Sequence, residues 1–150
     1  MNRKQTGFTI VELLILIVVI GILAAITIVA YNGIQERARV QKANTDLASL
    51  NKAIQSARIN ADKTLYGITG SNCTRCFDQA TYELTLDRIS AASGANLANL
   101  KAGDPWGNKY GIDENEGEGA TPCANKDSLY LMTGSKTGVN TQTIPFYNCP

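Results

Sequence analysis

The sequence predicts an α+β protein in which a long N-terminal helix packs against a small antiparallel sheet. Three observations predict this class. A continuous apolar run lies near the N-terminus, an amphipathic helical stripe follows it, and the remainder holds short strand-like segments with all four cysteines. We expect a basic segment over 1–7, a membrane-spanning half of the helix over 8–30, an amphipathic half over 31–61, and a globular head over 62–150.

The apolar run FTIVELLILIVVIGILAAITIVA covers 8–30, and its single charge is Glu12. As a helix it would span about 34 Å, enough to cross a hydrocarbon core of about 30 Å. A cleaved secretory signal would be shorter and would be followed by small residues at its cleavage site. A plain membrane anchor explains the length but leaves Glu12 unexplained. Because a carboxylate inside an apolar helix costs up to roughly 3 kcal/mol, Glu12 is a functional candidate that requires a cation.

The N-terminus MNRKQTG followed by FTIVELLI resembles the processing site of type IV prepilins. The matching parts are a basic leader with Arg3 and Lys4, then Gly7, Phe8 and Glu12. The resemblance implies a pilin fold. It also implies that a membrane-embedded prepilin peptidase removes the leader by cutting between Gly7 and Phe8, and that the new amino terminus is methylated.

Cleavage would create an ammonium group at Phe8. In a filament this group on one subunit would meet Glu12 of its neighbour, which neutralises both charges in a low-dielectric bundle. Many type IV pilins carry a proline partway along this helix, whereas here no proline precedes Pro105. Gly21 and the Asn32-Gly33 pair are therefore the weak points of the predicted helix.

Beyond the apolar run, small and aliphatic residues recur at spacings of three and four, which predicts one buried stripe on the continuing helix. The stripe consists of Ala43, Leu47, Leu50, Ile54, Ala57 and Ala61. The charged residues between them predict a solvated face, made of Lys42, Asp46, Lys52 and Arg58. Asn60 and Asp62 are signals that the helix ends near 61.

All four cysteines lie in the head, which we expect outside the cytoplasm, so disulfides are the natural interpretation. Of the three connectivities we favour Cys73–Cys76 with Cys123–Cys149, the second closing the C-terminal tail. Many type IV pilins have a C-terminal disulfide that encloses such a loop, and the resemblance favours the same choice. The Cys73-x-x-Cys76 spacing also fits a redox motif or half of a zinc site, but a βαβ context and a second close cysteine pair are both missing from the pattern.

The head is expected to hold a short helix over 82–92 and strands over 109–112, 128–133 and 143–147. An antiparallel sheet laid on the amphipathic helix gives the α+β class. The segment DPWGNKY, which begins at Asp104, resembles a DPWG-x-x-Y segment common in major pseudopilins of type II secretion and in some pilins. Its plainer interpretation is a tight turn with a packed indole.

The next run is dense in oxygen ligands and consists of Asp113, Glu114, Asn115, Glu116 and Glu118. It does not fit the spacing of an EF-hand, and a solvated acidic loop is the plainer interpretation. Pseudopilins of the class that the preceding segment resembles often bind calcium in a nearby loop. The resemblance therefore makes these five residues a candidate calcium site, and no other cofactor is expected.

The chain contains no histidine, which removes the commonest general base and metal ligand. With 14 basic against 13 acidic residues, it also lacks the excess charge of a dedicated nucleic-acid binder. We therefore expect no enzyme. The resemblance implies instead the structural subunit of a type IV pilus, serving adhesion, twitching motility or DNA uptake. The alternatives are a type II secretion pseudopilin or minor pilin, and a membrane-anchored redox or metal-binding protein.

The resemblance also predicts location and partners. The precursor would lie in the cytoplasmic membrane and the processed chain in an extracellular surface filament. The expected partners are other copies of the chain in a helical filament, the prepilin peptidase, an inner-membrane assembly platform, and a host-cell surface or DNA.

Overall fold

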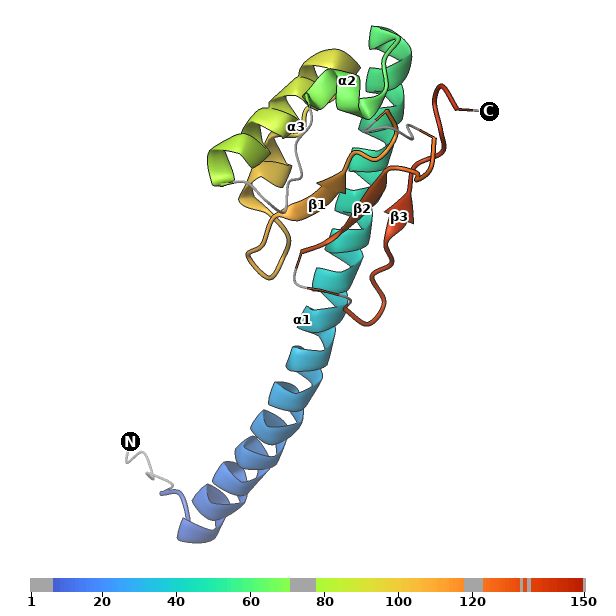
Figure 1. The fold of residues 1–150 in the computed structure, drawn as a ribbon. Coiled ribbons are helices and arrows are strands. Elements are labelled where there is room, and N and C mark those ends of the chain that lie inside the picture. The colour runs from blue at the N-terminus through green and yellow to red at the C-terminus, as the bar shows by residue number, and fades with distance from the viewer. Residues whose placement is uncertain (1–6, 71–77, 118–122, 133, 135, 150) are drawn as a thin grey trace, which may run out of the picture. The chain divides into compact units, whose positions relative to one another are not determined.

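The computed structural model describes residues 7–70, 78–117, 123–132, 134 and 136–149. The chain divides into two compact units, Met1–Ala38 and Arg39–Pro150. The fold is the predicted α+β class, with a long N-terminal helix, a three-stranded antiparallel sheet and a disulfide (Figure 1).

Helix α1 covers Ile10–Ala61 and passes through both weak points, Gly21 and Gly33, without a break. Its described side chains within the first unit are almost all exposed, Phe8 just ahead of it by 83% and Ile10 by 84%. In the described part of the chain, α1 is the one helix long and apolar enough to cross a membrane, judged by length and composition.

The predicted stripe is confirmed in the second unit. Its members Ala43, Leu47, Leu50, Ile54 and Ala57 are buried, while Ala61 at the helix end is half-buried. Asp62 adopts a left-handed conformation with φ of 51°, and the Lys63 amide donates to the Arg58 carbonyl at 3.3 Å. Asp tolerates this conformation better than most residues, so the predicted ending signal is confirmed.

The predicted solvated face is wrong for two of its four members. Lys42 and Lys52 are exposed, but Asp46 and Arg58 are buried with 7% and 2% of their surface exposed. The head also covers helix positions on either side of the apolar stripe, and it supplies polar partners to the side chains there. The Tyr110 hydroxyl donates to Asp46 Oδ2 at 2.6 Å, and acidic groups of the head surround Arg58.

The sheet has the order β1-β2-β3, with β1 at Tyr110–Asp113, β2 at Ser128–Leu131 and β3 at Gln142–Thr143. Both pairings are antiparallel, and the inward-facing pairs Tyr110↔Leu131 and Ile112↔Leu129 bring buried side chains onto the α1 stripe. All three predicted strands are present. The third is shorter than predicted because Pro145 has no N–H with which to extend a ladder.

Three further elements complete the head. Helix α3 covers Gln79–Ser93 and contains the predicted helix; Asp78 caps its start by accepting from the Thr81 amide at 2.9 Å. The short helix α2 (Leu65–Thr69) and the 3₁₀ helix η1 (Ala98–Ala102) were not predicted. Both are a little over one turn long, which is too short for a periodic pattern to reveal.

The DPWG segment forms the predicted tight turn. The Asp104 carboxylate accepts from the amides of Trp106 and Asn108, both at 2.9 Å, and the Gly107 amide donates to the Asp104 carbonyl at 3.0 Å. The indole is half-buried against the head core, as predicted. Gly103 before the turn has φ of 84°, and a Cβ there would lie 2.4 Å from the Asn108 carbonyl oxygen.

Candidate functional site

Glu12, the candidate assembly residue, closes the first turn of α1 in a reciprocal arrangement with Thr9. The Thr9 amide and hydroxyl donate to Glu12 Oε2 at 2.9 and 2.8 Å, and the Glu12 amide donates to the Thr9 hydroxyl oxygen at 3.3 Å. This is a capping box, which satisfies backbone donors that a helix start leaves unpaired. The T-x-x-E spacing is present in the sequence and is the signal that predicts this cap.

The cap fixes where the carboxylate lies. Glu12 is held at the helix start beside the predicted cleavage point between Gly7 and Phe8, at the beginning of an exposed apolar surface. Its negative charge also complements the positive end of the helix dipole. A cation that approaches this helix start meets a carboxylate already oriented by two hydrogen bonds.

A second charged cluster lies inside the head and centres on Arg58. Its guanidinium Nη2 pairs with Asp127 Oδ2 and lies 3.5 Å from Glu116 Oε2, while Nη1 donates to the Pro145 carbonyl at 2.8 Å. All three charged side chains are at least 97% buried. Burying a guanidinium is tolerable only with paired charges and hydrogen bonds, and these partners supply them at Nη1 and Nη2, whereas Nε has no hydrogen-bond partner among the described residues.

The two carboxylates of the Arg58 cluster also hold the backbone around them. Asp127 Oδ1 accepts from the amides of Asn115 and Glu116 at 2.8 and 2.7 Å. Glu116 accepts from the amides of Tyr147 and Asn148 at 2.8 and 2.6 Å. The cluster therefore ties the turn after β1 and the C-terminal tail to α1.

The tail is also closed covalently. Cys123 and Cys149 form a disulfide with a Cα–Cα distance of 5.5 Å across a separation of 26 residues. This confirms the predicted closure of the tail. The other predicted pair, Cys73–Cys76, lies outside the described residues.

The acidic run does not act as one group of ligands. Glu116 points to the tail, Asn115 donates its side-chain amide to the Lys126 carbonyl at 3.0 Å, and Asp113 is half-exposed at the end of β1. Glu114 is buried toward α2, and Glu118 lies outside the described residues. No three carboxylate or cysteine side chains of the described residues converge as metal ligands. The described donors thus do not fit a calcium site, and the calcium prediction as a whole stays a prediction because Glu118 is not described.

The carboxyl group of Glu114 lies in surroundings that disfavour its ionised form. It is 3% exposed, it is hydrogen-bonded with Thr69 of α2, and its Oε1 has no hydrogen-bond partner among the described residues. Burial raises the pKa of Glu114 to about 8, against the opposing effect of the Thr69 hydroxyl. The carboxyl is therefore mostly protonated at neutral pH.

Known proteins resemble this chain both in its N-terminal motif and over most of its length. Residues 2–28 match the family model described as the prokaryotic N-terminal methylation motif. The chain is 32% identical to the type II secretion system core protein G of Vibrio cholerae over 108 residues, which cover 72% of this chain and 70% of that protein. It is 34% identical to the type IV major fimbrial protein FimA of Dichelobacter nodosus over 117 residues, covering 78% and 71%.

The chain is also 36% identical to a fimbrial protein of Pseudomonas aeruginosa over 147 residues, which cover 98% of this chain and 86% of that protein. The chain belongs to the type IV pilin family. No solved structure matches this pilin. It is a pilin or pseudopilin subunit, and both kinds are structural components of filaments rather than enzymes.

Family membership explains why the pilin exposes so much apolar surface on the described part of α1 within Met1–Ala38, because that segment is built to contact lipid or other subunits. It does not explain the Arg58 cluster, which sequence reasoning also missed. Arg58 and Asp127 are 69 positions apart. A weak signal was available, since Arg58 directly follows Ala57 of the buried stripe and so borders the apolar face.

Proposed function

We propose that this pilin is the subunit of a type IV pilus, inserted in the cytoplasmic membrane as a precursor and then assembled into an extracellular surface filament. The observation that carries this proposal is the extent of the likeness to the fimbrial protein of Pseudomonas aeruginosa, which runs through 98% of the chain. The likeness to core protein G covers 72%.

Assembly in this proposal depends on the start of α1. The prepilin peptidase cuts between Gly7 and Phe8, and the new ammonium group at Phe8 of one subunit approaches Glu12 of its neighbour. Support comes from the capping box, which orients the carboxylate at the edge of the apolar surface. In a bundle of apolar helices, either charge alone would be costly, so pairing favours the one stagger that brings the two together.

The second candidate is a pseudopilin of type II secretion. It is favoured by the DPWG turn, which resembles a segment common in that class, and by the relatives named core protein G. Both candidates use the same assembly chemistry, so the start of α1 does not distinguish them.

The decisive test is N-terminal peptide mass spectrometry on filaments sheared from the cell surface, with electron microscopy of the same fraction. We expect an abundant protein that begins at a methylated Phe8. A chain that begins at Phe8 but stays in the membrane fraction would favour the pseudopilin or a minor pilin. A chain that retains Met1 would contradict the processing step itself.

A further inference from the structure

The start of α1 leaves the predicted cleavage point outside the helix. The helix begins at Ile10, residues 7–9 ahead of it are not helical, and Phe8 is 83% exposed. The Thr9 carbonyl accepts a helical hydrogen bond from the Leu13 amide at 3.3 Å, so Thr9 is the N-cap residue of α1. The bond between Gly7 and Phe8 therefore lies one residue ahead of the cap.

The cap opposes an extension of α1 over this bond. Backbone N–H and C=O groups in an apolar environment must be satisfied within the segment, which favours a longer helix. One more turn would include Phe8 and Gly7, and the Thr9 amide would then donate to the carbonyl four residues earlier. In the structure this amide donates to Glu12 Oε2 at 2.9 Å, and the Thr9 hydroxyl oxygen accepts from the Glu12 amide at 3.3 Å. Because a capping residue has a non-helical backbone, these bonds hold the segment before Ile10 out of the helix.

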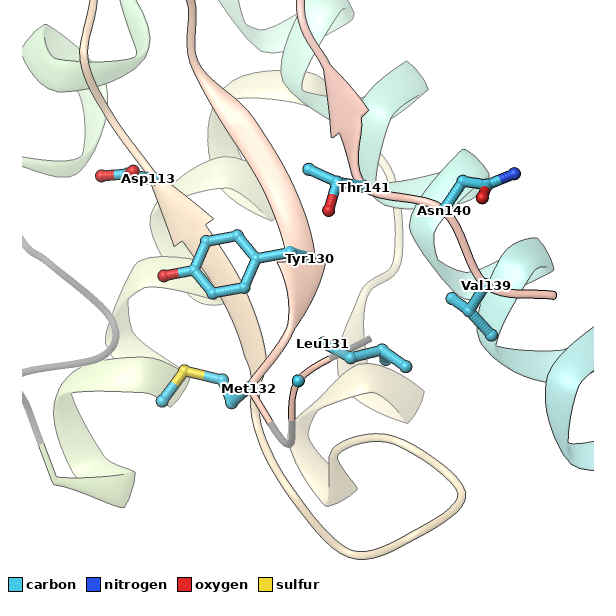
Figure 2. A pocket seen from close by; sticks show the side chains of 8 residues that line it. Asp113, Tyr130, Leu131, Met132, Val139, Asn140 and Thr141 are labelled. Atoms are coloured by element: carbon cyan, nitrogen blue, oxygen red, sulfur yellow. The ribbon is translucent and has the colours of Figure 1, made fainter. Parts of the chain in front are cut away.

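Gly7 gives a second observation, which points to a foreign group at this segment. In the head, Gly111 of β1 is required by the fold, because a Cβ there would lie 2.4 Å from the ring of Tyr130, which Figure 2 shows in front of β1. Gly7 is not among the glycines with positive φ, and no described atom lies within 4 Å of a Cβ built on it. An open, non-helical position without a side chain suits the close approach of another molecule to the backbone.

A peptidase must reach the carbonyl and the amide of the bond that it cuts. In a helix both groups are bonded within the chain, and protein sites that bind peptides through their backbone commonly take an extended segment. We propose that Thr9 is a positioning residue for processing, whose hydroxyl holds the start of α1 at Ile10 and keeps Gly7 and Phe8 in the non-helical form that the prepilin peptidase binds. This rests on the proposed function, which supplies the cleavage. It separates two roles, because the Thr9 hydroxyl serves cleavage whereas the charge of Glu12 serves assembly.

The test measures cleavage of the full chain in detergent by membranes that contain the prepilin peptidase. Mass spectrometry would follow the products over a range of precursor concentrations. Thr9→Val keeps the branched shape and removes the hydroxyl, so it should raise KM roughly fivefold, the shift in population expected from the loss of an N-cap. Its kcat should stay unchanged, because the bound, non-helical form is the same. Thr9→Ser keeps the hydroxyl and should restore the original KM.

Two controls and one spectroscopic measurement separate this role from general damage to the helix. The Thr27 hydroxyl also bonds the backbone of α1, at the Leu23 carbonyl at 2.7 Å, so Thr27→Val is the matched control and should leave KM and kcat unchanged. Glu12→Gln keeps an oxygen that accepts from the Thr9 amide, and it should also be cut with the original KM. With carbon-13 at Phe8, the chemical shift of its Cα should move toward the helical value in Thr9→Val and in none of the other variants.

The outcomes distinguish this proposal from the proposed function. If the original chain is not cut between Gly7 and Phe8, the proposed function fails and the role of Thr9 fails with it. If the original chain is cut there, the role of Thr9 alone is overturned by any of three results. These are an unchanged KM or a lowered kcat in Thr9→Val, a KM that Thr9→Ser does not restore, and a Phe8 chemical shift that does not move.

Discussion

Replacing Asp127 by Asn removes one of the two carboxylates that face the buried guanidinium of Arg58. The substitution preserves size and leaves a side-chain oxygen to accept from the amides of Asn115 and Glu116, as Asp127 Oδ1 does now. It exchanges the oxygen that pairs with Arg58 Nη2 for an NH₂ group, so that two donors face each other. The remaining counter-charge is Glu116, 3.5 Å from the guanidinium.

The expected loss in the free energy of unfolding follows from the burial of the Arg58 guanidinium. Breaking one side of a buried ion pair leaves a charge out of water without its partner, which typically costs about 3–5 kcal/mol. Glu116 keeps part of the compensation, so we expect about 3 kcal/mol for Asp127→Asn. Domains are usually stable by about 5–15 kcal/mol, which makes this a large fraction of the total.

The assay is urea unfolding of the full chain in detergent, followed by the fluorescence of Trp106. This is the single tryptophan of the chain, and it packs against the head core. The urea concentration at the unfolding midpoint should fall. The dependence of the free energy of unfolding on urea concentration should stay the same, since a change in it would indicate a different unfolded or native state.

The matched control is Asp87→Asn. Asp87 pairs with Lys101 at 2.6 Å, but these side chains are 56% and 32% exposed, so we expect a loss of about 1 kcal/mol or less. If Asp127→Asn costs no more than Asp87→Asn, the Arg58 cluster does not stabilise the head and this reasoning is refuted.

Three further predictions concern the start of α1, the tail and Glu114. Glu12→Gln should be processed and remain in the membrane fraction but yield few surface filaments by electron microscopy; normal filament numbers would contradict the pairing with Phe8. Cys149→Ser should lower the free energy of unfolding by about 3.5 kcal/mol for a closed loop of this length, and an unchanged urea midpoint would count against it. Because the folded pKa of Glu114 is raised to about 8, the folded state holds a proton that the unfolded state releases. Stability should therefore fall as pH rises from about 4.5 to about 8, by at most about 1.4 kcal/mol per pH unit. Glu114→Gln should flatten this dependence of stability on pH, as measured by thermal melting at a series of pH values.

The elements predicted well from sequence are those whose signal is periodic or local. The stripe from Ala43 to Ala57 repeats at helical spacing over many turns, and burial follows from that repeat. The DPWG turn is encoded within a few residues, because the Asp104 side chain bonds amides two and four positions later. The closure of the tail by Cys123 and Cys149 was one part of one of three possible connectivities, and the resemblance to type IV pilins favoured it.

The parts missed were those decided by contacts between distant residues. Nothing near Arg58 in the sequence indicates Asp127, and a charged residue on a helix is exposed far more often than buried. The acidic run illustrates the same limit. Its members Glu114 and Glu116 are two positions apart, yet one is buried against α2 and the other binds the tail amides. Residues two apart share a face only within a strand, and β1 ends at Asp113, before both of them.

The two units of the chain differ in whether their apolar side chains are covered and their charges paired. In Arg39–Pro150 the apolar stripe is covered, Arg58 has its counter-charges inside, and the tail is closed by a disulfide and by Glu116. In Met1–Ala38 the described apolar side chains are exposed, and Glu12 is oriented by Thr9 with no cation beside it among the described residues. The Arg58 cluster of the head therefore holds its counter-charges within the head, whereas the proposed function gives the start of α1 both apolar contacts and one positive charge. Under that proposal a membrane would supply the apolar contacts alone and a bundle of identical processed subunits would supply both, which would be the physical reason for assembly to follow cleavage.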